Sequence, residues 1–243
     1  MAAAVSRSDL RERVTQVAAA LLAEQGPGAV TTRGVAEAAG VQAPTIYRLF
    51  GDKDGLLEAV AEHAMAAQVQ AKAKVAASAA SEGVDPLEDL RDGWRSQIEF
   101  GLANPALFRL LSDPDRVRTS AAAQAGREVL STRIHRIAAA GLLRVSEDRA
   151  TDLVQAAGIG VIQSLLSMTD DRRDVTLAEA MYEAVLTQIL CDVPAPDGAD
   201  ATSAAAIALH AAAPELTMLT EAEQRMLSEW LTRIIERKPS ATT

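Results

Sequence analysis

Aromatic residues and cysteine are scarce in this sequence, and both shortages exclude classes of protein. Phe, Trp and Tyr make up 3% of the 243 residues, and β-branched residues rarely alternate with polar ones, so the period of two that strands need is missing. The only cysteine, Cys191, has no second cysteine to pair with, which excludes an intramolecular disulfide. We therefore expect an all-α protein that works in a reducing compartment, the cytoplasm.

Long hydrophobic runs are also missing, so we expect neither a secretion signal nor a membrane span. The N-terminus has no apolar core of the kind that signal peptides carry. The most apolar stretch, 153–168, is short for a span and contains Gln155, Gln163 and Ser164, whose polar groups hydrocarbon would leave unsatisfied. This stretch predicts a buried helix.

Motifs typical of enzymes are absent as well. The histidines His63, His135 and His210 are far apart, with no acidic residue or histidine at metal-ligand spacing. No Gly-rich phosphate loop precedes a helix, and Gly158-Ile159-Gly160 alone is no nucleotide motif. We expect no metal, no cofactor and no enzymatic activity.

The acidic net charge of -9 argues at first against a nucleic-acid partner. Residues 1–60, however, hold six Arg or Lys against seven Asp or Glu, so this region is nearly neutral and the rest of the chain carries most of the acidic excess. A DNA partner must therefore be argued from where the cations are placed.

Three helices are predicted near the N-terminus. A helix over 8–24 has one apolar face, and a Gly-Pro-Gly sequence ends it. A second helix follows Thr31, whose hydroxyl can cap it, with Val30 and Val35 placed as a hydrophobic staple. A third helix begins after Gln42, with Pro44 in its first turn, and ends near Phe50.

Two short helices joined by a sharp turn at Gly40, after a longer amphipathic helix, are the layout of a helix-turn-helix DNA reader. The second short helix would enter the major groove with its N-terminal residues toward the base edges. Lys53 begins the next helix and can meet a phosphate. The candidates for reading the sequence are Gln42, Ala43, Thr45 and Arg48.

This region resembles the TetR family of transcriptional regulators. The resemblance is carried by TTRGVAEAAGV from Thr31, by PTIYRLF from Pro44, and by Lys53 with the two leucines that follow at 56 and 57. It covers residues 10–60, about a fifth of the chain. It implies an all-α fold in which a three-helix helix-turn-helix DNA-binding domain is joined by a long helix to a larger helical ligand-binding and dimerisation domain.

The resemblance and the geometry of the motif together mark nine candidate DNA contacts. They are Thr32, Arg33, Gln42, Ala43, Pro44, Thr45, Tyr47, Arg48 and Lys53. For Tyr47 a place in the core and a phosphate contact are both open, whereas Phe50 is expected in the core. Asp52 and Asp54 flank Lys53 and weaken its attraction for phosphate, which favours modest affinity with a shallow salt dependence.

The rest of the chain predicts further helices over 53–83, 86–103, 105–111, 114–140, 146–168 and 176–191. Pro86, Pro105 and Pro114 each suit a first helical turn, and Thr176 with Glu179 forms a capping box. Segment 193–214 is predicted as a linker followed by a marginal helix. The last helix is capped by Thr220 with Glu223 and carries a stripe of Met226, Leu227, Trp230, Leu231 and Ile234, which must pack on something.

The resemblance also implies a homodimer that binds palindromic operator DNA and a small-molecule effector. Helices 146–168 and 176–191 resemble the pair that forms a four-helix bundle across the two-fold axis; a purely intrachain core is the other interpretation. A mainly apolar effector pocket has six candidate residues, which can equally be core: Trp94, Phe100, Phe108, Leu111, His135 and Ile162.

These observations divide the chain into a DNA-binding domain over 1–52, an effector-binding and dimerisation domain over 53–192, and a C-terminal extension over 193–243. The function indicated is a sequence-specific transcriptional regulator, in the family most often a repressor. A helical protein-interaction module without specific DNA binding is the alternative, and an all-helical enzyme is a weaker one.

Overall fold

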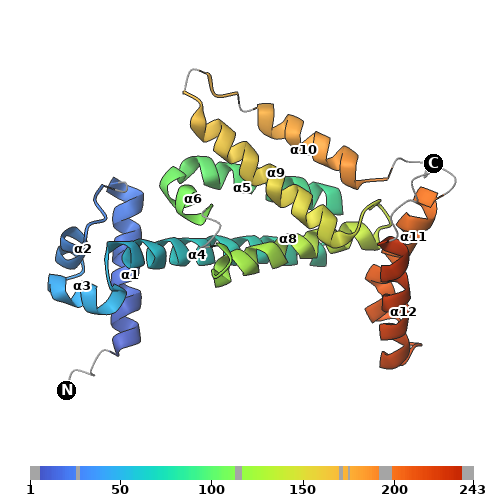
Figure 1. Cartoon of the computed structure of the whole chain (residues 1–243), viewed down its shortest axis with the longest axis horizontal. Helices are drawn as coiled ribbons and strands as arrows, with labels where there is room; N and C mark the ends of the chain where they lie inside the picture. Colours follow the sequence, from blue (N-terminus) through green and yellow to red (C-terminus); the bar gives the residue numbers. More distant parts are fainter. Residues whose placement is uncertain are drawn as a thin grey trace. The chain divides into compact units, whose positions relative to one another are not determined.

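The computed structural model describes residues 6–25, 28–112, 117–169, 172–174, 176–191 and 199–236. Within these ranges the regular elements are helices, and the only β pairing is an isolated bridge between Leu143 and Leu190 (Figure 1). None of the helices described is both long enough and apolar enough to cross a membrane. The expected all-α class is confirmed.

The chain divides into two compact units. Unit 1 comprises Met1–Lys74 and Phe100–Gly126, and unit 2 comprises Val75–Glu99 and Arg127–Thr243. Three helices run through the boundary: α4 (Lys53–Ser81), α5 (Pro86–Ala103) and α8 (Ala121–Ala139). The backbone therefore passes between the units through continuous helices rather than through loops.

Unit 1 is built on the three predicted N-terminal helices, α1 (Arg7–Gln25), α2 (Thr32–Ala38) and α3 (Ala43–Phe50). The short helix α6 (Pro105–Leu111) also belongs to it. One core joins these helices to α4, because apolar residues at helical spacing turn toward a common centre. Its fully buried residues are Val14, Ala18, Val30, Val35, Ile46, Leu56 and Val60.

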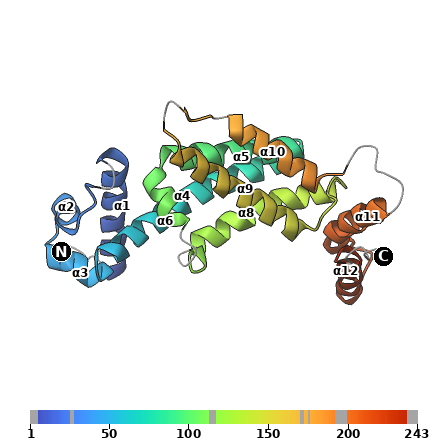
Figure 2. The same cartoon turned by 45° about the horizontal axis from the view of Figure 1, so that its top comes forward.

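Unit 2 contains the long helices α9 (Glu147–Ser167) and α10 (Thr176–Ile189), which lie side by side in both views (Figures 1 and 2). A short backbone pairing fixes the end of α10 against the loop before α9. The amide of Arg144 donates to Ile189 at 2.9 Å and the amide of Cys191 to Leu142 at 2.9 Å. Tyr182, Ile162 and Leu165 are almost fully buried in this unit.

A buried ion cluster ties α5 to α8 within unit 2. The Asp89 carboxylate, with 2% of the side chain exposed, accepts from Nε of Arg133 at 3.0 Å and from Nη1 of Arg136 at 2.7 Å. Arg136 also donates to the carbonyl oxygen of Val84 at 2.6 Å. Gly93 permits this arrangement, because a Cβ there would lie 2.7 Å from Nη1 of Arg133.

The chain ends in a helical hairpin of α11 (Ala199–Ala212) and α12 (Glu221–Ile235), joined through the 3₁₀ turn η2 (Ala213–Glu215). The alanine-rich part of segment 193–214 thus forms α11, as predicted; residues 192–198 lie outside the described part. The predicted capping box of Thr220 and Glu223 is confirmed at the start of α12. It holds the pKa of Glu223 below its usual range, mainly through the backbone hydrogen bond from Thr220.

Two sequence predictions about helices are wrong. The helix predicted over 114–140 is not continuous, because residues 118–120 interrupt it and α8 begins at Ala121, where the Ser120 hydroxyl accepts the amide of Ala123 at 2.9 Å. The predicted start at Pro114 lies outside the described residues. Thr176 is the first residue of α10 rather than its cap. Its amide and hydroxyl donate to Asp174 at 2.9 and 2.6 Å, and Glu179, the expected capping-box partner, pairs with Arg91 instead.

Candidate nucleic-acid interface

Helix α2 starts as the sequence predicts. The Thr31 hydroxyl accepts the amide of Gly34 at 3.0 Å and so satisfies one of the first free amides of the helix. Val30 before the cap and Val35 after it are both fully buried, so the staple is in place. The cap and the staple fix where α2 begins relative to the core.

The turn between α2 and α3 depends on Gly40. Its φ of 66° lies in the left-handed region, which a side chain disfavours. The amide of Val41 then donates back to Ala36 at 2.9 Å, closing the end of α2. Gln42 follows as the exposed N-cap of α3 and makes no side-chain capping hydrogen bond.

Helix α3 has one buried and one exposed face. Ile46, Leu49 and Phe50 are buried in the unit 1 core, and Phe50 is therefore a core residue, as expected. Tyr47 is 52% exposed, which removes it from the core, and its hydroxyl lies 3.5 Å from that of Thr32 in α2. The nine predicted contact residues are all at least partly exposed on α2, on α3 or at the start of α4.

Two arginines of α1 hold the C-terminal end of α3. Arg7 donates to the carbonyl oxygen of Arg48 at 3.1 Å, and Arg11 donates to that of Leu49 at 2.8 Å. The Arg11 guanidinium also lies 4.7 Å from the centre of the Phe50 ring. Cations suit this position because the last carbonyls of a helix lack intrahelical partners and carry negative partial charge. Sequence reasoning missed both roles.

The start of α4 places Lys53 next to two carboxylates with different roles. The Asp52 carboxylate accepts the amide of Gly55 at 2.8 Å and so caps α4. Asp52 therefore has a structural role besides weakening the attraction of Lys53 for phosphate. Lys53 is exposed at the first helical position. Gly55 is required by packing, since a Cβ there would lie 2.2 Å from the carbonyl oxygen of Phe50. Sequence reasoning missed Gly55, which the capping pattern of Asp52 could have marked.

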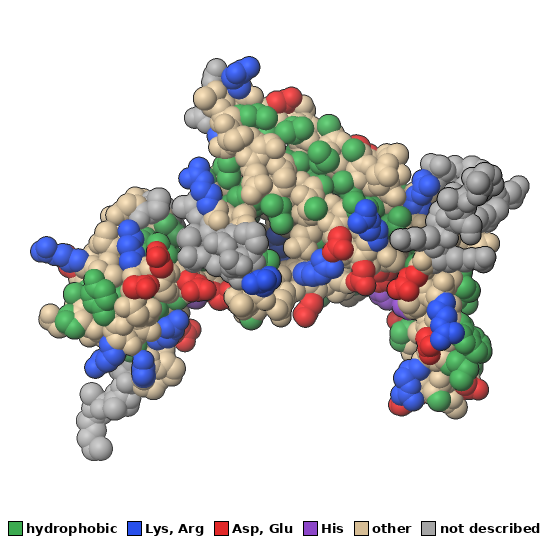
Figure 3. All heavy atoms as spheres, viewed as in Figure 1, with side chains coloured by type: hydrophobic (Ala, Val, Ile, Leu, Met, Phe, Trp, Pro, Cys, Tyr) green, Lys and Arg blue, Asp and Glu red, His purple; other side chains and the backbone are tan. Residues whose placement is uncertain are grey.

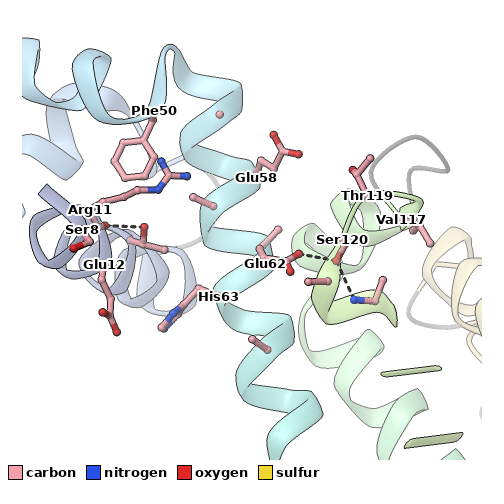
Figure 4. A pocket seen from close by; sticks show the side chains of 17 residues that line it. Ser8, Arg11, Glu12, Phe50, Glu58, Glu62, His63, Val117, Thr119 and Ser120 are labelled. Atoms are coloured by element: carbon pink, nitrogen blue, oxygen red, sulfur yellow. Dashed lines mark hydrogen bonds between the residues drawn. The ribbon is translucent and has the colours of Figure 1, made fainter. Parts of the chain in front are cut away.

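Unit 1 also contains a cavity of about 680 Å³ (Figure 4). It lies over α4, with α1 on one side and segment 117–123 on the other. On its right-hand side the Glu62 carboxylate accepts the Ser120 hydroxyl at 2.6 Å and the amide of Ala122 at 2.8 Å. Glu62 of α4 is therefore bonded directly to the first turn of α8.

The six residues predicted for an effector pocket occupy different surroundings, and none lines this cavity. In unit 1, Phe100 packs against the core and Phe108 is buried in α6. Leu111 ends α6, and its side chain lies outside the described part. In unit 2, Ile162 is buried and His135 pairs through Nδ1 with Glu147 at 3.1 Å.

Trp94, the sixth of these residues, is held firmly in unit 2. Its indole donates to the carbonyl oxygen of Ala178 at 3.1 Å, and its ring centre lies 5.5 Å from that of Tyr182. Burial raises the pKa of Tyr182 to about 12. Arg91 lies over the Tyr182 ring, and its own pKa is raised, first by the hydrogen bond to Glu183.

A buried three-helix core with an exposed, polar second short helix defines a helix-turn-helix DNA-binding protein. Comparison with protein families agrees, because residues 14–60 match the model described as bacterial regulatory proteins, tetR family. Residues 14–60 are therefore similar to the DNA-binding region of TetR-family regulators, and the function that this region supports is DNA-binding transcription regulation. No protein with a curated function matches its sequence.

Solved structures agree with the fold. The chain is similar to the TetR-family repressor FadR of Thermus thermophilus in complex with lauroyl-CoA, with 24% identity and a TM-score of 0.61 over 77% of this chain and 100% of that one. It is also similar to RolR in complex with resorcinol, with 24% identity and a TM-score of 0.54 over 83% and 94%. Identities this low show the shared fold alone.

Proposed function

We propose that the chain is a repressor that binds a palindromic operator as a homodimer and leaves it when a small molecule binds. The observation that carries this function is the division of α3 into a buried apolar face and an exposed face with Tyr47 and Arg48. Such a helix is fixed by its core while its exposed side chains remain available to the major groove.

The proposed roles differ along the interface. Gln42, Ala43, Thr45 and Arg48 read base edges from the N-terminal part and exposed face of α3, with Ala43 limited to contact with a thymine methyl group. Phosphate contacts fix the register of the domain and come from cations and hydroxyls beside the groove. The residues proposed for the backbone are Thr32, Arg33, Tyr47 and Lys53, whereas Pro44 is proposed to contact the DNA through its apolar ring only.

Selection of bound duplexes from a random DNA pool at fixed salt tests this proposal. A motif with two equivalent half-sites is the expected result, because a two-fold dimer reads the same half-site twice.

Arg48→Ala should relax sequence preference and cost about 1 to 3 kcal/mol of binding free energy at one base position, whereas Lys53→Ala should weaken binding to all sites alike. Arg13→Ala, exposed on α1, is the control. The proposal is wrong if the selection finds no enrichment over non-specific binding, or if both variants bind the selected operator with unchanged affinity. Either result would favour the alternative function, a protein-interaction module without specific DNA binding.

The homodimer is proposed through α9 and α10. From Ala156 to Ser167, α9 has no charged residue, and exposed small or neutral residues follow one side of it. Gly160 is open, since a Cβ there would meet nothing within 4 Å. The surface over α9 and α10 in Figure 3 is correspondingly poor in charge. An uncharged face of small residues suits close helix packing in a four-helix bundle.

We further propose an effector domain over 53–192, after a DNA-binding domain over 1–52, with 193–243 as an extension. The lauroyl chain and the aromatic ring of the ligands in the similar structures, lauroyl-CoA and resorcinol, support an effector with an apolar part. A regulator of this kind works in the cytoplasm on chromosomal DNA, and we propose no catalytic activity for it. The pocket residues proposed remain Trp94, Phe100, Phe108, Leu111, His135 and Ile162.

Within unit 1, Glu62 supports a route for the effector signal. It joins α4, which begins directly after the DNA-reading helices, to the first turn of α8 through two hydrogen bonds. A shift of α8 on effector binding would then move α4 and the reading helices. Glu62→Ala should reduce the effector's influence on operator affinity, where typical couplings are about 1 to 3 kcal/mol, more than it reduces affinity itself. Glu58→Ala, exposed one turn earlier on α4, is the matched control.

A further inference from the structure

The cavity of unit 1 has the size of a small-molecule site. Its volume of about 680 Å³ lies within the roughly 300 to 1,000 Å³ of pockets that hold drug-sized ligands. Helix α1 forms one of its sides (Figure 4), and neither the proposed DNA contacts nor the residues proposed for the effector pocket line it. It is therefore a second cavity, separate from the proposed effector pocket.

The charged side chains around this cavity are mainly acidic. Among its described lining residues are three glutamates, Glu12, Glu58 and Glu62, against one arginine, Arg11. Arg11 is already engaged, because it holds the end of α3. His63 also lines the cavity, and even in its protonated form it would leave an excess of negative charge. A cleft lined by one sign of charge attracts the opposite sign, so this cavity favours a cation over an anion.

Glu58 and Glu62 place two of these carboxylates one turn apart on α4. Residues four apart on a helix are neighbours on one face, and like charges there repel each other. Figure 4 shows both side chains on the side of α4 that faces segment 117–123. Glu62 is bonded to Ser120 and Ala122, whereas Glu58 makes no hydrogen bond or ion pair with any residue that the structure describes. A cation bound beside them would relieve the repulsion and give Glu58 a partner.

Small and apolar side chains form much of the remaining lining. They include Phe50, Ala59, Ala66, Val117 and Ala123. Such walls bury the hydrocarbon surface of a ligand. Thr15, 6% exposed, adds a hydroxyl oxygen that can still accept a hydrogen bond, since its own hydrogen is donated to the carbonyl oxygen of Arg11 at 2.9 Å. The lining therefore suits a molecule with an apolar body and few polar groups.

We propose that this cavity binds an organic monocation with an apolar body, such as a protonated alkylamine or arylalkylamine. The ammonium group lies against Glu58 and Glu62 and donates to their carboxylate oxygens. Glu62 can accept it besides its two existing bonds, because an ionised carboxylate has about four acceptor positions. The hydrocarbon part lies along the alanines of α4, Ala59 and Ala66. The site depends on the shape and charge of unit 1 and not on DNA binding.

Titration of the whole protein with three matched probes tests the charge class. The probes are phenylbutylamine, which is protonated near neutral pH, phenylbutanol and phenylbutyrate, which share one hydrocarbon part and differ in charge. The amine should bind about tenfold more tightly than the alcohol, because two exposed ion pairs contribute up to about fivefold each. The carboxylate should bind more weakly than both. No binding of the amine, or binding of the carboxylate as tight as that of the amine, would overturn the proposal.

Variants of Glu58 place the ammonium group. Glu58→Gln should lower the affinity for phenylbutylamine by up to about fivefold and leave the affinity for phenylbutanol unchanged. Glu24→Gln, which removes the same charge at an exposed residue of α1 outside the lining, should bind the amine as the wild type does. Equal amine affinities in Glu58→Gln and Glu24→Gln would overturn the proposal. Because no amine is present in the operator titrations, Glu58→Ala remains the control for Glu62→Ala there.

A variant that fills the cavity tests the place of the hydrocarbon part. Ala66→Phe adds a ring to the lining without changing the charge, so amine affinity should fall by at least about tenfold, as the loss of most of the buried apolar area implies. Ala67→Phe is the matched control, because Ala67 is the next residue of α4 and is exposed outside the lining. Circular dichroism compares the folding of both variants, and Glu58→Gln tests the site without added bulk. Amine binding that is unchanged in a folded Ala66→Phe would place the ligand elsewhere and overturn the proposal.

Discussion

Arg11 in α1 donates from Nη1 to the carbonyl oxygen of Leu49 at the end of α3, at 2.8 Å. The recognition helix is therefore fixed at its C-terminal end by a side chain from another helix. Arg11→Ala should lower operator affinity and reduce the free energy of unfolding by about 1 kcal/mol, because it removes one charged hydrogen bond and the contact with the Phe50 ring. Binding titrations and denaturant unfolding measure the two effects, with Arg13→Ala as the control. An unchanged affinity would show that the hydrogen bond of Arg11 does not position α3 for DNA binding.

Gly55 should tolerate no side chain. A Cβ would lie 2.2 Å from the carbonyl oxygen of Phe50, so Gly55→Ala must displace either α4 or the end of α3. We expect a loss of about 2 kcal/mol or more in the free energy of unfolding, from strain at a backbone contact. Gly28→Ala, where an added Cβ meets nothing within 4 Å, should be close to neutral in the same thermal unfolding assay.

The buried cluster of Asp89, Arg133 and Arg136 should be sensitive to the loss of its only carboxylate. Asp89→Asn leaves Arg133, 5% exposed, without a countercharge, and breaking such a buried pair typically costs about 3 to 5 kcal/mol. Asp92→Asn is the matched control, because the Asp92 side chain is 63% exposed on the same helix. Similar denaturation midpoints for the two variants would mean that Arg133 finds another partner.

Unit 2 should lose stability at high pH through Tyr182. Burial raises its pKa from 10.0 to about 12, so the folded state holds the phenolic proton more tightly than the unfolded state does. Its contribution is complete below pH 10 and is lost as the pH rises through about 12. Tyr182→Phe should remove this part of the alkaline destabilisation. In a Tyr47→Phe background the absorbance of the ionised phenol then reports Tyr182 alone, and a midpoint near 10 would contradict the prediction.

Gly160 tests the proposed dimer face. Gly160→Ala should leave the dimer intact and stabilise α9 by up to about 1 kcal/mol, because glycine is the poorer helix former. Gly160→Trp should separate the protomers by keeping the facing helices apart. Asp148→Trp, exposed in the first turn of the same helix, controls for the added bulk. A dimer that survives Gly160→Trp would place the interface elsewhere.

The sequence by itself determined the helical class, the order of most helices and the helix-turn-helix motif. These follow from local chemistry: the Thr31 cap, the positive φ of Gly40 and the apolar period of 3.6 act over a few residues and need no distant partner. The same local rules placed Phe50 in the core. They left Tyr47 open, because core and surface positions of an aromatic residue share the same spacing.

Only the tertiary structure decided which distant groups meet. Arg11 on the Leu49 carbonyl, Glu62 on the first turn of α8 and Glu179 on Arg91 each join residues far apart in sequence, and no spacing rule connects them. Such a pairing also explains why the capping box predicted for α10 is wrong, since Glu179 pairs with Arg91 instead. In α12, packing against α11 and η2 decided that Leu231 is buried and Trp230 exposed, because an apolar stripe does not specify which of its sides the chain itself covers.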